Sequence, residues 1–115
     1  MQFTLAHTFD SRVIAIGAST GGTEALHNVL KQLPKSVPGI AVVQHIPPDF
    51  SRMFAERLNN TLALEVKEAK TGDYLQQGHV LIAPGDHHMR VIRIADRYKV
   101  ECFKGEENGY DNWNR

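Results

Sequence analysis

The sequence predicts an α/β protein with a doubly wound, mainly parallel sheet and helices on both faces, the three-layer arrangement of Rossmann-like folds. Two observations favour this class. Short apolar runs rich in β-branched residues, typical of buried strands, alternate with segments whose apolar residues recur at helical spacing. Glycine and proline stand at the junctions between them. Such alternation indicates right-handed crossovers between parallel strands, with ligands binding at the carboxyl ends of the strands.

The first predicted unit is a strand followed by a helix. Val13–Ile16 is a continuous apolar run that ends at Gly17. After a glycine-rich stretch, apolar residues recur at helical spacing over Ala25–Leu33, and Pro34 prevents the helix from continuing.

A second unit repeats this order. Gly39–Val43 is a β-branched run typical of a strand, and a helix is predicted to follow, with Asp49 or Ser51 available near its N-terminus. Its apolar residues are expected in the core: Met53, Phe54 and Leu58.

Beyond residue 60 the pattern predicts short strands. The last two suggest a C-terminal β-hairpin, and the charged segment Glu65–Lys70 is expected to be a solvated face. With so few helices one sheet face would be thinly covered, so we expect an incomplete domain. The four strands are predicted at Ala63–Val66, His79–Ile82, Met89–Ile94 and Lys99–Phe103.

Composition narrows the possible functions. The 115 residues include 13 Lys and Arg against 13 Asp and Glu, a balance that gives no basic field for nucleic acid. No apolar stretch approaches the roughly 20 residues that span a bilayer, so no membrane insertion is expected. We expect one cytoplasmic domain over residues 12–115, preceded by an N-terminal extension, residues 1–11, that lacks signal-peptide features. The single cysteine, Cys102, agrees with a reducing compartment.

A serine at the first strand-to-helix turn is the main candidate for chemistry. Ser19 stands in the sequence GASTGG, where a side chain is exposed and helix-start N–H groups can stabilise an oxyanion. Gly21 and Gly22 let a substrate carbonyl approach the backbone, and Thr20 offers a hydroxyl for positioning. Helix capping by Ser19 or Thr20 is the alternative interpretation.

The same turn could instead hold a phosphate at a helix N-terminus. Its spacing matches neither G-x-G-x-x-G nor G-x-x-x-x-G-K-[ST], and Gln44 and His45 follow the second strand in place of an acidic residue for a ribose. A phosphate or nucleotide binder is therefore a third, less favoured hypothesis.

His45 is the candidate general base. It follows the second predicted strand, and Pro47 and Pro48 stiffen the loop that carries it. Because adjacent parallel strands end at the same sheet edge, we expect His45 close to Ser19. A histidine that only hydrogen-bonds backbone in a loop is the alternative interpretation.

No metal and no cofactor are expected. His87 and His88 are adjacent on an extended segment, so they point to opposite faces, and no Cys, Asp or Glu cluster accompanies them. The remaining histidines are predicted to be surface or structural residues: His7, His27 and His79.

Three segments together resemble one family: IGASTGGTEAL at Ile16–Leu26, VVQHIPPDFSRMFAERL at Val42–Leu58 and EAKTGDYLQQGHVLIAPGDHHM at Glu68–Met89. In this order and spacing they are similar to the protein-glutamate methylesterase domain of bacterial chemotaxis. The resemblance implies a serine esterase that hydrolyses glutamate γ-methyl esters on cytoplasmic chemoreceptor helices, with deamidation of receptor glutamines in many members. It implies neither cofactor nor metal. The family roles fall on Ser19 as nucleophile and His45 as acid and base, with Thr20 beside them.

The chain departs from the family pattern in two ways. Members commonly carry a phosphorylatable receiver domain ahead of the esterase, whereas about ten residues precede the first predicted strand, so we expect no phosphorelay control from this chain itself. The family's triad aspartate stands in a later segment of the type T-G-M-G-x-D-G-A, and none occurs before Arg115. Because loss of a triad acid costs roughly four orders of magnitude in turnover, we expect severe impairment without abolition.

An incomplete domain has a second consequence. Missing strands would leave an unpaired apolar sheet edge, which favours a dimer or strand exchange. The competing functional hypothesis is a receptor-docking module of the same fold with weak catalysis.

Overall fold

The computed structural model describes residues 4–10, 13–18, 23–44 and 46–104. Two strands come first, helices and strands then alternate up to residue 61, and strands alone follow. In chain order the elements are β1 Thr4–Asp10, β2 Val13–Ala18, α1 Thr23–Leu30, β3 Gly39–Gln44, α2 Pro48–Thr61, β4 Glu65–Glu68, β5 Tyr74–Leu75, β6 His79–Ile82, β7 His87–Ile94 and β8 Arg97–Lys104.

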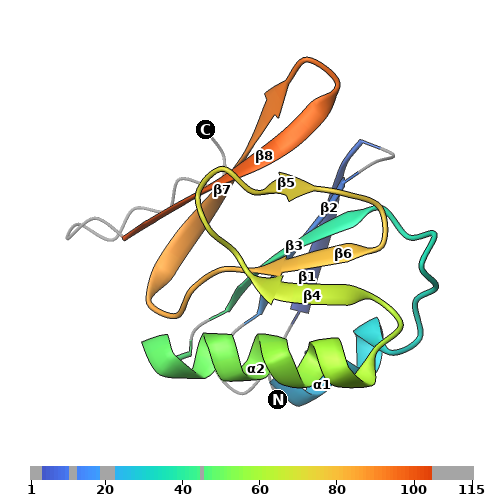
Figure 1. Cartoon of the computed structure of the whole chain (residues 1–115), viewed down its shortest axis with the longest axis vertical. Coiled ribbons are helices and arrows are strands. Elements are labelled where there is room, and N and C mark those ends of the chain that lie inside the picture. Colours follow the sequence, from blue (N-terminus) through green and yellow to red (C-terminus); the bar gives the residue numbers. More distant parts are fainter. Residues whose placement is uncertain (1–3, 11–12, 19–22, 45, 105–115) are drawn as a thin grey trace.

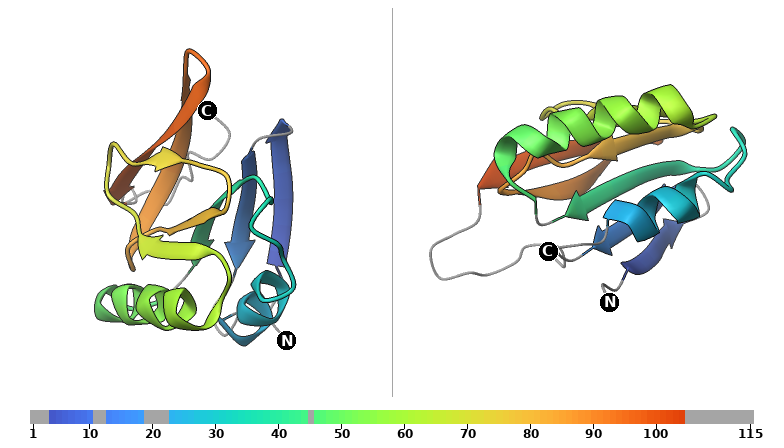
Figure 2. Two further views of the ribbon diagram at one scale, coloured as in Figure 1. Left: turned by 45° about the vertical axis from the view of Figure 1, so that its right-hand side comes forward. Right: turned by 90° about the horizontal axis from the view of Figure 1, so that it is seen from below.

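The larger sheet has five strands in the order β1-β2-β3-β6-β4. β2, β3, β6 and β4 are mutually parallel, which confirms the α/β class and the mainly parallel sheet. β1 pairs antiparallel with β2 at one edge, where Figure 2 shows the two strands side by side. No strand was predicted before Val13. The segment TLAHTFD mixes polar and apolar residues, as antiparallel edge strands do, and lacks the continuous apolar run of a buried parallel strand.

Both described helices pack on one face of this sheet, and Figure 1 shows them together below the parallel strands. The prediction of helices on both faces is therefore corrected for the described part of the chain. The core on this side joins the helices to four strands through buried side chains, among them Ile16, Leu26, Leu30, Ile40, Val42, Phe54, Leu58, Val66, Val80 and Ile82.

The strand order explains this placement. The chain moves from β2 to β3 and then past β6 to β4 in one direction, and right-handed crossovers in one direction place their helices on one face. From β4 the chain turns back to β6, so its connection runs over the opposite face. That connection contains the short strand β5 instead of a helix.

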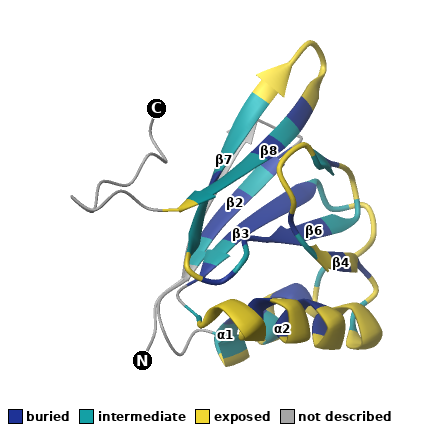
Figure 3. Cartoon of the chain, turned by 60° about the vertical axis from the view of Figure 1, so that its left-hand side comes forward, coloured by how far each residue is buried: buried dark blue, intermediate teal, exposed yellow. Residues whose placement is uncertain are grey.

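A three-stranded antiparallel sheet, β5-β8-β7, covers the second face. β7 and β8 form the predicted C-terminal hairpin, paired from His87 with Lys104 to Ile94 with Arg97. The tip of the hairpin extends beyond the large sheet and is exposed (Figure 3). Its inner residues form a second core with the large sheet, which includes Val13, Ala41, Leu75, Leu81, Met89, Tyr98 and Val100.

Helix α2 differs from its prediction in two respects. Its N-cap is Pro47, which makes no side-chain capping bond, so neither Asp49 nor Ser51 caps it. Met53 is 53% exposed, whereas Phe54 and Leu58 are buried as predicted. Around the helix, Phe54 lies on the side of Ala55 and Leu58, and Met53 lies about 100° further from that side, towards solvent. Neither described helix has the length and hydropathy of a bilayer-spanning segment.

Candidate functional site

The carboxyl ends of β2, β3 and β6 lie at one edge of the parallel sheet. β2 and β3 pair in register over their full length, from Val13 with Gly39 to Ala18 with Gln44. β3 continues the pairing with β6, where Val42 faces Ile82. The segments that follow these three strands therefore leave the sheet at the same edge, which is where ligands bind in such folds.

The predicted site residues lie outside the described part of the chain. These are Ser19, Thr20, Gly21, Gly22 and His45. Their flanking elements are described: β2 ends directly before Ser19, α1 begins directly after Gly22, and His45 stands between β3 and the residues that lead into α2.

A short turn connects β3 to α2. The amide of Ile46 donates to the carbonyl oxygen of Gln44 at 3.1 Å, and the amide of Phe50 donates to the carbonyl oxygen of Pro47 at 3.0 Å. Pro48 is the first residue of α2. It has no N–H, and the N–H of a first helical residue would have no partner within the helix. The backbone on both sides of position 45 is thus fixed by hydrogen bonds or by proline rings.

A buried serine joins this turn to two other elements. Ser51 is 0% exposed in the first turn of α2. The backbone amide of Gly85, in the turn after β6, donates to Ser51 Oγ at 2.7 Å. Ser51 Oγ in turn donates to the carboxylate of Glu68 at the end of β4. We call these three residues, Ser51, Glu68 and Gly85, the Ser51 clamp.

Gly85 also touches the turn that follows His45. A Cβ atom at position 85 would lie 2.6 Å from the carbonyl carbon of Pro47 and 2.7 Å from the carbonyl oxygen of Ile46. Real Cβ atoms essentially never lie this close to a non-bonded backbone atom, so only glycine fits here without a shift of the backbone. The turn after β6 therefore presses its backbone directly against residues 46 and 47.

Sequence reasoning missed the clamp. Ser51 was expected as a helix cap and Glu68 as part of a solvated face, whereas Ser51 is buried and Glu68 only partly exposed. The exposed residues Glu65, Lys67 and Lys70 do match the prediction for that segment. A serine inside a predicted first helical turn, facing inward with Phe54 and Leu58, was the only local signal.

The two adjacent histidines after β6 have separate partners. His87 Nδ1 lies 3.0 Å from the carbonyl oxygen of Gly85, and the His88 ring stacks on Phe103 with centroids 5.6 Å apart. Among the described residues, no three His, Cys, Asp or Glu side chains come together as metal ligands would.

Gln44 carries a buried amide at this edge of the sheet. Its side chain is 2% exposed, and among the described residues neither amide atom has a hydrogen-bond partner. Because side chains alternate along a strand, it projects to the same face as Ile40 and Val42, where the helices pack. A polar side chain is therefore buried at the end of β3, directly before His45 in the sequence.

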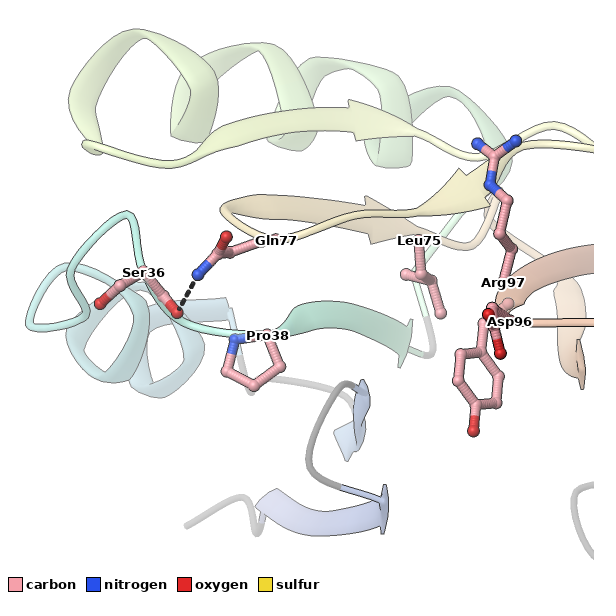
Figure 4. Close-up of a pocket in the computed structure, with 7 residues that line it drawn as sticks. Ser36, Pro38, Leu75, Gln77, Asp96 and Arg97 are labelled. Atoms are coloured by element: carbon pink, nitrogen blue, oxygen red, sulfur yellow. Dashed lines mark hydrogen bonds between the residues drawn. The ribbon is translucent and has the colours of Figure 1, made fainter.

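Two hollows lie at the opposite edge of the sheet. Neither includes a nominated residue, and the amino ends of parallel strands are not where such folds bind ligands. The first, of about 370 Å³, is drawn in Figure 4, where Gln77 Nε2 donates to the carbonyl oxygen of Ser36 at 2.9 Å. Pro38, which lines it, directly precedes β3. The second, of about 470 Å³, adjoins the starts of β4 and β6 and is lined by Asn59, Leu62, Ala63, Leu64, Glu65, Val66, Lys67 and His79.

The mainly parallel sheet, with its candidate residues following two paired strands at the carboxyl edge, defines a Rossmann-like α/β protein with a candidate site at that edge. The chain belongs to the CheB methylesterase family, because the family model of that description matches residues 14–112.

Individual relatives agree with this family. The chain is 54% identical over 101 residues to a protein-glutamate methylesterase/protein-glutamine glutaminase of Syntrophotalea carbinolica, covering 88% of this chain and 28% of that protein. A Pseudomonas aeruginosa protein with the same enzyme name is 55% identical over 100 residues, covering 86% and 29%. The crystal structure of the Thermotoga maritima CheB methylesterase catalytic domain matches with a TM-score of 0.76 and 38% identity, covering 84% of this chain and 52% of that one. The chain thus spans less than a third of the curated relatives and about half of the solved domain.

Proposed function

We propose that this chain is part of a methylesterase catalytic domain that hydrolyses glutamate γ-methyl esters on chemoreceptors and deamidates receptor glutamines. The observation that carries the proposal is the register of β2 and β3. Ala18 and Gln44 are paired, so Ser19 and His45 follow two partnered residues at the carboxyl edge of the sheet. Neighbouring strand ends are positions from which a nucleophile and its base can come within hydrogen-bond reach.

In this mechanism Ser19 is the nucleophile and His45 the general base. Ser19 Oγ attacks the γ-carbonyl carbon while His45 accepts its proton, and N–H groups around Thr20, Gly21 and Gly22 stabilise the oxyanion. The start of α1 at Thr23 adds the positive end of a helix dipole. His45 then protonates the departing methanol, or ammonia from a glutamine, and leaves a glutamyl ester on Ser19.

Water completes the reaction. His45 takes a proton from the water as it attacks the glutamyl ester, and returns that proton to Ser19 Oγ as the bond to serine breaks. The product is the free glutamate side chain. The triad acid of the family lies outside this 115-residue sequence in our proposal, so turnover is expected roughly four orders of magnitude below that of a complete site.

The proposed partners are the methylated cytoplasmic helices of chemoreceptors, which places the reaction in the cytoplasm. Family membership supports this proposal, as does the name shared by the relatives.

The test is methanol release from a methylated receptor fragment by the chain, beside its Ser19→Ala and His45→Gln forms. His79→Gln is the matched control, because His79 lies at the opposite edge of the sheet and pairs with Glu65. We expect slow release that Ser19→Ala and His45→Gln abolish and His79→Gln preserves. No release from a folded chain that still binds the receptor would instead support the docking module.

A further inference from the structure

We propose that the Ser51 clamp positions the general base by fixing the backbone that follows His45. The proposal rests on the function proposed above for His45. Its structural content, however, is carried by described residues alone: Ser51, Glu68, Gly85, Ile46 and Pro47.

The hydrogen bonds of Ser51 have a defined direction. A serine hydroxyl has one proton to donate and two lone pairs. Gly85 N–H can only donate, so Ser51 Oγ accepts there and keeps its proton for another partner. The carbonyl oxygen of Pro48 lies 2.9 Å away, but the carboxylate of Glu68 is the stronger acceptor and the closer one. The two hydrogen bonds therefore run in one direction, from the Gly85 amide through the Ser51 hydroxyl to the negatively charged carboxylate of Glu68.

These hydrogen bonds connect three elements that lie far apart in sequence. Ser51 belongs to the first turn of α2, 17 residues before Glu68 and 34 residues before Gly85. It holds the turn after β6 against the start of α2. If that turn moved away from α2, it would break the hydrogen bond to Ser51. It cannot move closer, because Gly85 already lies against the backbone of Ile46 and Pro47.

The hydrogen bond from buried Ser51 to the partly exposed carboxylate of Glu68 stabilises the fold, as hydrogen bonds to charged groups do. In addition, the clamp supplies a fixed backbone position directly after His45. A displacement of about 1 Å in a catalytic group can lower turnover by roughly 100-fold.

The experiment measures kcat and KM for methanol release, and the pH dependence of kcat, in Ser51→Ala and Glu68→Ala. The matched control is Ser36→Ala, since Ser36 is exposed at the opposite sheet edge. Glu68→Gln keeps an acceptor for Ser51 and serves as the conservative variant. Hydrogen exchange at the Gly85 amide, read by NMR, reports the clamp without any catalysis.

We expect Ser51→Ala and Glu68→Ala to lower kcat by about 10- to 100-fold with KM within about twofold, and to move the acidic limb of the pH profile. Glu68→Gln should recover most of the loss, and Gly85 exchange should accelerate in Ser51→Ala. Wild-type kcat and pH profile in a folded Ser51→Ala chain would overturn the proposal. If Ser51→Ala does not fold, Glu68→Ala decides, because Glu68 is only partly buried. Activity retained in Ser19→Ala would overturn the proposed function instead, whatever the clamp variants do.

Discussion

Ala18 and Gln44 face each other as the last paired residues of two parallel strands. The segments after β2 and β3 therefore leave the sheet from adjacent positions at its carboxyl edge. The buried side-chain amide of Gln44 lies at the end of β3, and its effect on stability can be measured.

Replacement of Gln44 by Leu should stabilise the chain. Burying an amide without a hydrogen-bond partner costs about 1–3 kcal/mol, and Gln44 has no partner among the described residues. We expect Gln44→Leu to raise the free energy of unfolding by about 1–2 kcal/mol in urea denaturation. Gln32→Leu makes the same substitution at an exposed position and should change the free energy of unfolding by less than about 0.5 kcal/mol. A less stable Gln44→Leu chain would show that the amide is bonded in solution.

An alanine at position 85 should be strongly destabilising. The added Cβ would meet the backbone of Pro47, which cannot move as a flexible side chain would. We expect Gly85→Ala to lower the free energy of unfolding by about 1–3 kcal/mol. Gly17→Ala is the matched control, because a Cβ there meets no atom of the described residues within 4 Å, and it should change stability by less than about 1 kcal/mol. Equal effects of the two substitutions on the urea midpoint would contradict the close contact.

The two faces of α2 should respond differently to truncation. Leu58 is 0% exposed in the core between α2 and the sheet, whereas Met53 is 53% exposed. Leu58→Ala should cost about 2–5 kcal/mol, and Met53→Ala less than about 0.5 kcal/mol. Thermal unfolding followed by circular dichroism at the helix wavelength checks both. A large loss in Met53→Ala would mean that its side chain is covered in solution.

Cys102 should react slowly in the folded chain. Burial, with further contributions from the carboxylates of Asp73 and Glu68, raises the pKa of its thiol from 9.0 to about 11. At pH 8 the reactive thiolate is then about 100-fold scarcer than in the unfolded chain. Alkylation by iodoacetamide, counted by mass spectrometry with and without denaturant, measures the ratio.

The same shift makes stability depend on pH. The folded state holds the thiol proton more tightly, so this contribution is fully present below pH 9.0 and is lost as the pH rises towards 11. Cys102→Ala should remove this part of the pH dependence. Equal slopes between pH 9 and 11 for both chains would contradict the raised pKa.

The sequence predicted the parallel core well because its strands are continuous apolar runs. The runs at Val13–Ile16 and Gly39–Val43 correspond almost unchanged to β2 and β3, and the predicted C-terminal hairpin corresponds to β7 and β8, which turn at Ala95 and Asp96. β1 was not predicted, because a mixture of polar and apolar residues is the normal pattern of an antiparallel edge strand and is not specific to it. The face on which α2 packs depends on strand order, which composition does not encode.

Part of the candidate site could likewise be predicted from the sequence, and part could not. Ser19 and His45 could be nominated because each follows a recognisable strand, and the structure adds the register that supports their pairing as a prediction. Ser51, Glu68 and Gly85 could not be nominated, since no local pattern relates a helix, a strand end and a turn separated by 17 and 34 residues.

The place of β6 in the sheet matters for how the chain is made. β6 lies between β3 and β4 although both precede it in sequence, so the gap between them stays open until residues 79–82 have left the ribosome. Until then β3 and β4 each expose an edge that should pair with a strand not yet synthesised. A pause in translation before this point would prolong the life of an intermediate whose open edges could bind each other or another nascent chain.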